Sequence, residues 1–285
     1  MDKGTLYICA TPIGNLEDIT LRVLRVLQEV GLIACEDTRH TAKLLHHFEI
    51  RTPTTSYHEN NKEAKGHQLL SRLNDGENIA LVSDSGMPGI SDPGRELIQA
   101  CHKEEIPVTI CPGATAGLSA LVLSGFTAHP HVFEGFLPRD KSDRKKILAN
   151  LATERRTMVF YEAPHRLLTV LSEMQNIWGD RNAALVRELT KKFENVSRGT
   201  LSQLLNNYVD TTPRGEFVII VEGATEQIST YPENVQEHVE SYVNQGHSEM
   251  DAIKLVAKER GVAKNVIYKQ IKQKVIDEFA GEGYN

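Results

Sequence analysis

The sequence has few cysteines, and this shortage excludes two classes of protein. Only 4 cysteines occur among 285 residues; each lies in or beside an apolar run, and none forms a C-x-x-C pair. A disulfide framework or a zinc site therefore has little support, and no metal is expected. We expect buried thiols in a reducing compartment at Cys9, Cys35, Cys101 and Cys111.

The sequence also lacks any apolar stretch that approaches the length of a membrane span. The first four residues lead directly into a predicted strand rather than into the hydrophobic region of a signal peptide. We therefore expect a soluble, cytoplasmic protein with no membrane partner.

The charge is unevenly distributed along the chain. A formal net charge of -6 argues against a protein that coats nucleic acid without specificity. Between Lys254 and Lys274, however, there are seven lysines or arginines and one acid. This segment is expected to form two helices, 250–258 and 265–274, around a glycine-containing turn, and it resembles a helix-turn-helix. Its basic residues, including Lys264 and Lys269, predict either contact with nucleic acid or only a solvated surface on a small helical domain.

Hydrophobic patterning predicts an α/β protein of two domains with a small third one. The expected boundaries are 1–113 and 114–228 for two α/β lobes, and 229–285 for the basic helical domain. A helix is expected over 16–30, and the charged segment 139–156 is expected to form a helix on the surface. Strands are expected at 5–9, 32–35, 79–82 and 108–111 in the first lobe, and at 158–161, 183–186 and 217–221 in the second.

Three loops follow predicted strands and precede helices, which is where open α/β sheets bind ligands. They are TPIGN at 11–15, SDSGMPGISDPG at 83–94 and CPGATA at 111–116. Each has a simpler interpretation: a tight turn for the first, and for the second an ordered connection in which Asp92 caps the next helix. Three such loops in one sheet favour a single ligand-binding cleft.

These loops resemble the successive signatures of the tetrapyrrole methylases, and the resemblance extends over roughly residues 4–223. Within that family, TPIGNLEDIT, EDTRHT, SDSGMPGISDPG, FYEAPHRL and RELTK look like the branch that methylates the 2′-hydroxyl of cytidine in small-subunit ribosomal RNA. One departure is Met87, where many tetrapyrrole methylases carry an aspartate. Methylation of a tetrapyrrole is correspondingly disfavoured.

The resemblance implies a methyltransferase with S-adenosylmethionine in a cleft between two lobes, ribosomal RNA or the small subunit as substrate, and a homodimer. The chain has no G-x-G-x-x-G after a strand, unlike Rossmann-type methyltransferases. The implied cofactor contacts are Pro12, Ile13, Gly14, Asp84, Gly86, Met87, Pro88, Ile90, Thr115, Ala116, Tyr161, Leu189 and Phe217.

A ribose hydroxyl is a weak acid, so its methylation is helped by a base or a hydrogen-bond acceptor near the oxygen. Candidates for this role are Asp37, His58, Glu162, His165 and Glu188. Of these, the three carboxylates Asp37, Glu162 and Glu188 are selected, although Asp37 beside Arg39 also fits a plain local ion pair. Arg39, His58, Arg187 and Lys191 are expected on the RNA side of the cleft. Two other functions stay open: methylation of a corrin precursor, and RNA binding without catalysis.

Overall fold

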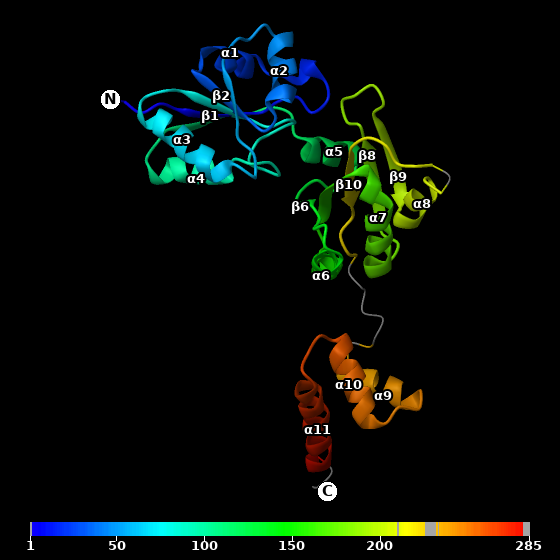
Figure 1. The fold of residues 1–285 in the computed structure, drawn as a ribbon. Helices are drawn as coiled ribbons and strands as arrows, with labels where there is room; N and C mark the ends of the chain where they lie inside the picture. Colours follow the sequence, from blue (N-terminus) through cyan, green and yellow to red (C-terminus); the bar gives the residue numbers. More distant parts are fainter. Residues whose placement is uncertain (1, 210, 226–231, 233, 282–285) are drawn as a thin grey trace. The chain divides into compact units, whose positions relative to one another are not determined.

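The computed structural model describes residues 2–209, 211–225, 232 and 234–281. The chain divides into two compact units, Met1–Ala224 and Thr225–Asn285. Two sheets lie in the first unit, and three helices make up the described part of the second (Figure 1). The boundary expected between residues 228 and 229 lies outside the described residues, and the division after residue 113 stays a prediction.

The first sheet is fully parallel, with the strand order β3-β2-β4-β1-β5. All residues of β2 and β4 are buried, because helices cover both faces of a parallel sheet. The predicted α/β class is confirmed. One strand was missed because its sequence, Thr-Thr-Ser, is polar and only half-buried. The bounds are β1 (Leu6–Cys9), β2 (Leu32–Cys35), β3 (Thr54–Ser56), β4 (Ile79–Val82) and β5 (Val108–Cys111).

Helices α1 and α2 cover one face of this sheet, and α3 and α4 cover the other (Figure 1). The single helix expected over 16–30 is wrong: a 3₁₀ turn comes first, and α1 begins only after the extended residue Thr20, whose side chain accepts a hydrogen bond from Val23 N. The expectation of buried, unpaired cysteines is confirmed for all four. The bounds are η1 (Leu16–Asp18), α1 (Leu21–Glu29), α2 (Thr38–His47), α3 (Lys62–Asn74) and α4 (Arg95–Lys103).

The second sheet has the order β6-β7-β10-β8-β9; β6 and β7 are parallel and the other pairs antiparallel. The three central strands agree with the predicted ones, whereas the two edge strands are partly exposed and carry no clear apolar pattern. The strands are β6 (His131–Phe136), β7 (Thr157–Glu162), β8 (Asn182–Arg187), β9 (Asn195–Thr200) and β10 (Phe217–Val221). The helices are α5 (Ala116–Ser124), α6 (Lys141–Asn150), η2 (Leu151–Thr153), α7 (Pro164–Trp178) and α8 (Leu201–Asn206).

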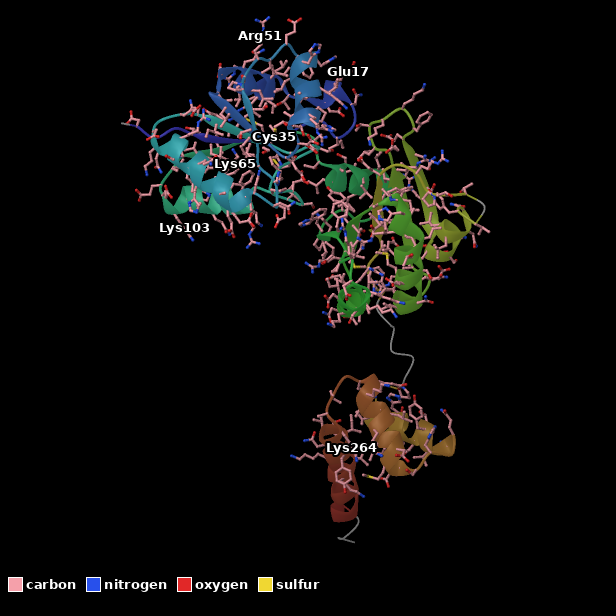
Figure 2. All side chains as sticks on the ribbon, in the orientation of Figure 1. Glu17, Cys35, Arg51, Lys65, Lys103 and Lys264 are labelled. Atoms are coloured by element: carbon pink, nitrogen blue, oxygen red, sulfur yellow. The ribbon has the colours of Figure 1, made fainter. Side chains whose placement is uncertain are left out.

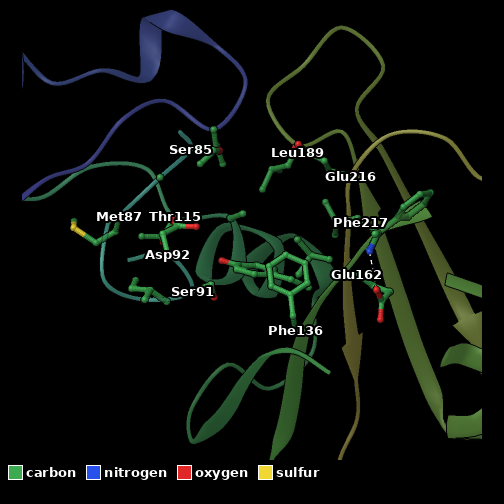
Figure 3. Close-up of a pocket in the computed structure, with 18 of the residues that line it drawn as sticks. Ser85, Met87, Ser91, Asp92, Thr115, Phe136, Glu162, Leu189, Glu216 and Phe217 are labelled. Carbon is green, nitrogen blue, oxygen red and sulfur yellow. Dashed lines mark hydrogen bonds between the residues drawn. The ribbon is translucent and has the colours of Figure 1, made fainter. Parts of the chain in front are cut away.

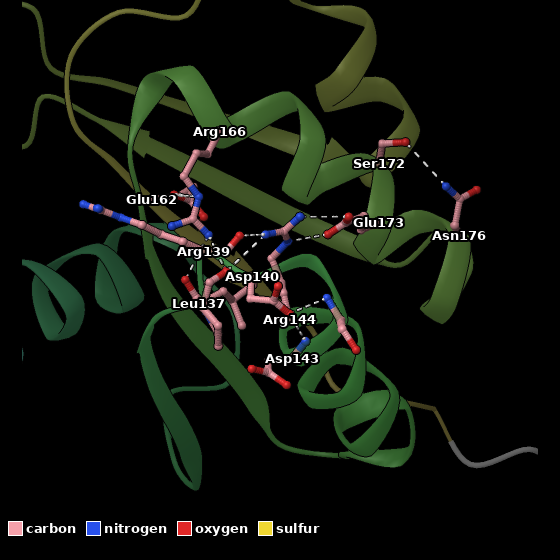
Figure 4. Close-up of polar contacts among 12 residues, drawn as sticks. Leu137, Arg139, Asp140, Asp143, Arg144, Glu162, Arg166, Ser172, Glu173 and Asn176 are labelled. Atoms are coloured by element: carbon pink, nitrogen blue, oxygen red, sulfur yellow. Dashed lines mark hydrogen bonds and ion pairs between the residues drawn. The ribbon is translucent and has the colours of Figure 1, made fainter.

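Helix α6 forms as expected in the charged segment, but one of its charges is not on the surface. Arg144 is only 6% exposed. Its Nε and Nη2 donate to the two carboxylate oxygens of Glu173 on α7, at 2.6 and 3.0 Å. Its Nη1 donates to the backbone oxygens of Pro138 and Arg139, so the guanidinium ties three segments together (Figure 4).

The second unit contains α9 (Val235–Asn244), α10 (Glu249–Glu259) and α11 (Lys264–Gly281). The predicted pair of helices is confirmed, and Gly261, with φ +65°, makes the turn between them. The hydrophobic core of the second unit is small and aliphatic, and includes Val239, Ile253, Val256 and Ile267. No helix among the described residues is long and apolar enough to cross a membrane.

Candidate functional site

An apolar cavity of about 310 Å³ lies in the first unit, between the loops that follow β1, β4 and β5 and one end of the second sheet (Figure 3). We call it the apolar pocket. Its volume is within the range of small-molecule sites, and its lining of aliphatic and aromatic side chains with a few acids is typical of them. The lining residues are Ile13, Ser85–Met87, Ile90–Asp92, Thr115, Ala116, Phe136, Tyr161–Pro164, Val186, Leu189 and Glu216–Val218.

Backbone hydrogen bonds hold the first two loops together. Thr11 N donates to Gly86 O at 2.9 Å, and Gly86 N donates to Thr11 O at 3.1 Å. Gly86 has φ +80°, and a Cβ atom there would lie 3.3 Å from Cγ2 of Ile13. Because both the backbone conformation and the close approach favour glycine, Gly86 places Ile13 at the edge of the pocket. The structure thus brings together the loops expected to form one cleft.

Tyr161 connects the second sheet to the start of α5. Its hydroxyl accepts a hydrogen bond from Gly117 N at 2.9 Å, and burial raises its pKa. The rings of Phe133 and Phe136 pack edge-on against it, with centroids 5.1 and 5.4 Å away. This aromatic cluster forms a firm wall of the apolar pocket.

Two acids, the buried Glu162 and the half-buried Asp92, give the apolar pocket its electrostatic character. Burial raises the pKa of Glu162 and the pKa of Asp92. Glu162 Oε1 accepts from Ala163 N at 2.8 Å and lies 3.4 Å from Arg166 Nε. Its Oε2 is buried and has no hydrogen-bond partner among the described residues. Since an unsatisfied buried carboxylate oxygen is costly, the pocket is suited to a ligand that brings positive charge or a donor.

A second cavity, of about 490 Å³, adjoins the first and shares Ile13, Ser85 and Glu216 with it. We call it the polar pocket. It lies between α2 and the loops after β1 and β4. Its other lining residues are Thr11, Pro12, Gly14, Leu16, His40, Thr41, Lys43, Leu44, Ser83, Asp84 and Lys191.

The segment 187–191 runs along both pockets. Leu189 lines the apolar pocket and Lys191 the polar one. The residues on either side of Leu189, Glu188 and Thr190, have φ values of +51° and +65°, an uncommon conformation for side chains other than glycine. Gly14 lies against this segment, because a Cβ atom at Gly14 would be only 2.5 Å from Lys191 Cγ and 2.9 Å from Thr190 Oγ1. Local strain at such a segment is typical of functional sites.

The structure divides the expected cofactor residues between the two pockets. Pro12, Gly14 and Asp84 line the polar pocket, Ile13 lines both, and Pro88 is buried beside the apolar pocket without lining it. The remainder line the apolar pocket, namely Gly86, Met87, Ile90, Thr115, Ala116, Tyr161, Leu189 and Phe217.

Of the three catalytic candidates, Glu162 lines the apolar pocket, and Asp37 and Glu188 line neither pocket. Arg39 hydrogen bonds hold the pKa of Asp37 well below its usual range, which makes its carboxylate a weak proton acceptor. Partial burial acts to raise the pKa of Glu188, but hydrogen bonds from Glu216 N and Lys191 Nζ outweigh it and lower that pKa.

The expected RNA-side residues are dispersed. The Arg39 side chain is 89% exposed and paired with Asp37, while Arg187 Nε donates to Arg214 O at 2.7 Å. His58 is half-buried, and its backbone N–H donates to Asn61. Lys191 alone among them lines a pocket, where it pairs with Glu188 and Glu216 at 3.1 and 2.8 Å.

Asp92, Phe136 and Glu216 are among the pocket residues that were not predicted from the sequence. The capping interpretation of Asp92 is wrong, because the N-cap of α4 is Gly94 and no side chain caps that helix. The position of Asp92 in a glycine-rich loop was the signal that could have found it. Phe136 ends an edge strand and Glu216 precedes a central one, and neither carries a local motif. Among the described residues, no group of three metal-binding side chains is present.

Comparison with known proteins identifies the family of this chain. The sequence profile of the tetrapyrrole (corrin/porphyrin) methylases matches residues 5–205. A protein of Halalkalibacterium halodurans named ribosomal RNA small subunit methyltransferase I is 48% identical over 274 residues, covering 94% of each chain. A Bacillus subtilis protein of the same name is 46% identical over 273 residues, again covering 94% of each.

A solved structure of the methyltransferase CobJ has a TM-score of 0.59 at 20% identity, and the match covers 78% of this chain and 95% of that one. At that identity the likeness concerns the fold alone. The profile spans most of the chain, and the curated relatives span nearly all of it. The chain belongs to the tetrapyrrole (corrin/porphyrin) methylase family, in the branch of the ribosomal RNA small subunit methyltransferase I proteins.

Proposed function

We propose that this chain uses S-adenosylmethionine, the methyl donor of its family, to methylate the 2′-hydroxyl of a cytidine ribose in small-subunit ribosomal RNA. The observation that supports RNA as the substrate is the extent of the match to relatives named ribosomal RNA small subunit methyltransferase I. Their 274 aligned residues exceed the 224 residues of the first unit, so the similarity continues into the helical unit, which contains the basic run Lys254–Lys274. The assignment of the 2′-hydroxyl of cytidine as the methylated group rests on the resemblance of the sequence motifs.

The apolar pocket fits the cofactor. S-adenosylmethionine, when bound, supplies an electrophilic methyl group on a positively charged sulfur. The carboxylates of Asp92 and Glu162 complement a cation, and the unpartnered Glu162 Oε2 is free to accept a hydrogen bond from the ligand. Tyr161 and Phe217 present aromatic surface. We therefore assign cofactor binding to the predicted residues that line this pocket.

Glu162 is the one predicted catalytic carboxylate on a pocket wall, so we assign it the role of complementing the positive charge of the bound cofactor. Asp37 and Glu188 are better suited to positioning. Asp37 N donates to Asp84 Oδ1 at 3.2 Å, across to the loop after β4. Glu188 anchors both Lys191 and the backbone of Glu216. Such fixed orientation supplies much of the rate of a methyl transfer.

Incubation of the protein with radiolabelled S-adenosylmethionine and purified small ribosomal subunits tests the proposal. We expect label in the RNA, recovered after nuclease digestion as 2′-O-methylcytidine and identified by mass spectrometry. Label on the base would reject the ribose assignment, and label only in a parallel reaction with a corrin precursor would reject RNA as substrate. Absence of transfer to either, with RNA binding intact, would indicate a non-catalytic binding protein.

We also propose a homodimer formed through the exposed face of α5. Leu118 and Val122 on this helix are 53% and 74% exposed. Phe133, partly exposed itself, lies beside Gly117 on the same helix. An apolar patch of this kind on a surface favours association, because burying it removes apolar area from water.

The Leu118→Glu, Val122→Glu protein is therefore expected to be monomeric where the wild type is dimeric, because two carboxylates per chain would be placed in the contact. Light scattering after size-exclusion chromatography measures the mass. Val209→Glu is the matched control, since Val209 is also 74% exposed but lies after α8. Equal masses for the double variant and the wild type would contradict the interface.

The helical unit offers fewer free cations than its composition suggested. Lys254 pairs with Asp251 at 2.8 Å, and Arg260 donates to Pro232 O and to His238. Lys264 and Lys269 are exposed and form no ion pair with any residue that the structure describes. Lys264 begins α11 (Figure 2). We propose these two lysines as phosphate contacts.

The Lys264→Ala, Lys269→Ala protein should bind RNA more weakly and with a shallower salt dependence. Neutralising one phosphate of a single strand adds about 0.7 to the slope of log K against log salt, so a protein without both lysines should have a slope shallower by about 1.4. Filter binding across a salt series measures this. Lys103→Ala, an exposed lysine of α4, is the control. Superimposable slopes would mean that these lysines only keep the surface solvated.

A further inference from the structure

We assigned the cofactor to the apolar pocket, so the neighbouring polar pocket is left without a ligand. The two share Ile13, Ser85 and Glu216, so a group held in one lies next to a group held in the other. At about 490 Å³ the polar pocket is within the size range of small-molecule sites. It is lined by both acids and bases, unlike its apolar neighbour.

We propose that the polar pocket receives the nucleotide to be methylated, extruded from the RNA, with a flanking phosphate at Lys43 and His40. This inference rests on the proposed function, because it names the acceptor side of the same site. The methyl group would then pass across the shared edge of the two pockets.

The basic side chains of the polar pocket differ in whether a carboxylate already pairs with them. Lys191 is already neutralised by Glu188 and Glu216. Lys43 and His40 lie three residues apart on α2, a spacing that puts both on one face of a helix. Both are exposed, and neither forms an ion pair with a residue in the described part of the chain. An anion at this side of the pocket would therefore meet the ammonium group of Lys43, which no internal carboxylate pairs with, and the ring of His40 as a possible hydrogen-bond donor.

The interior of the polar pocket offers hydrogen bonds suited to a nucleotide. Asp84 lines the same pocket, and carboxylates accept hydrogen bonds from the exocyclic amine of cytosine. A phosphate outside and a base inside match this distribution of groups.

Extrusion of the nucleotide follows from the position of the pocket. The polar pocket lies between α2 and two loops, so a nucleotide stacked within a helix could not enter it. Enzymes that act inside a pocket take their nucleotide out of the stack or use single-stranded RNA, and a loop nucleotide largely avoids the energetic cost of unstacking. The proposal therefore expects an unpaired target.

A Lys43→Cys protein tests the assignment directly. The native cysteines Cys9, Cys35, Cys101 and Cys111 are all buried, and burial raises the pKa of Cys101 to about 11, which leaves little reactive thiolate near neutral pH. The introduced thiol would thus be the main target of a maleimide. Lys103→Cys, at the end of α4, is the matched control; Lys103 is labelled in Figure 2 and lines neither pocket.

We expect small ribosomal subunits to slow maleimide labelling of the Lys43→Cys protein by about tenfold or more, which corresponds to about 90% occupancy of a protected site. S-adenosylmethionine alone should not slow it, and the Lys103→Cys protein should label at the same rate throughout. Protection of the Lys43→Cys thiol by S-adenosylmethionine alone would assign the pocket to the donor and overturn the proposal. Equal labelling with and without subunits that the wild type methylates would also overturn it.

A charge-reversal variant distinguishes failure of the acceptor assignment from failure of the proposed function. Lys43→Glu should raise the KM for small subunits by about tenfold, the effect of about 1.4 kcal/mol, and leave the calorimetric Kd for S-adenosylmethionine unchanged. If the wild type methylates subunits and Lys43→Glu has an unchanged KM, only the acceptor assignment fails. If the wild type transfers no methyl group to RNA, the proposed function fails and the acceptor assignment with it.

Discussion

The Ala116→Phe protein is expected to bind S-adenosylmethionine at least about a hundredfold more weakly than the wild type, a loss of about 2.7 kcal/mol. Ala116 is the first residue of α5 and lines the apolar pocket. A phenyl ring there would enter a cavity of about 310 Å³ that Tyr161 and Phe217 also line. These two side chains are held by the hydrogen bond from Gly117 N to Tyr161 and by strand pairing, so they have little freedom to move away.

Calorimetric titration with S-adenosylmethionine measures this effect, and urea unfolding establishes that the variant is folded. Ala64→Phe is the matched control, because Ala64 is an exposed alanine of α3 that lines neither pocket. The control should bind the cofactor as the wild type does. Undiminished affinity of a folded Ala116→Phe protein would show that the cofactor lies elsewhere.

Arg144→Ala is expected to lower the free energy of unfolding by about 3–5 kcal/mol, the cost of removing one partner of a buried ion pair. The substitution leaves Glu173 with an uncompensated charge in a site where it is 9% exposed. It also removes the donors to Pro138 O and Arg139 O, so the chain that follows β6 loses an anchor close to Phe136 in the apolar pocket.

The matched control is Lys146→Ala on the same helix. Lys146 pairs with Asp143 at 2.9 Å, but both side chains are largely exposed, and such pairs contribute about 0–1 kcal/mol. Urea unfolding of both variants decides the matter. Similar losses below about 1 kcal/mol in the two proteins would mean that the Arg144 pair is solvated rather than buried.

The same pair predicts a pH dependence. A hydrogen bond from Arg144 is the main cause that lowers the pKa of Glu173 in the folded protein. A carboxyl with a lowered folded pKa stabilises the protein above the ordinary glutamate value of about 4.3. This contribution should be lost as the pH falls through the folded pKa, so wild type and Arg144→Ala should approach each other in stability at acid pH.

Local sequence patterns predicted the elements whose environment they determine directly. Ile79–Val82 and Phe217–Val221 are runs of apolar residues, and each is a central strand. The polar strand Thr54–Ser56 and the edge strands β6 and β9 escaped because their pairing partners, not their own residues, make them strands. The helix expected to start at residue 16 failed because Asn15 and Thr20 cap separate short elements.

The sequence by itself determined the family, the presence of three glycine-containing loops after strands, and the basic run between Lys254 and Lys274, because each depends on the order of residues along a short segment. Only the tertiary structure decided that Arg144, alone among the charges of its helix, is buried against Glu173. It also divided the residues expected to bind the cofactor between an apolar and a polar pocket, and it brought Asp92, Phe136 and Glu216 to the apolar pocket. The physical reason is that the burial, the ion pairing and the pKa of a side chain depend on which distant segments meet around it. A charged residue in a helix or a glutamate before a strand looks the same in the sequence whether its side chain lies in solvent or in the wall of a pocket.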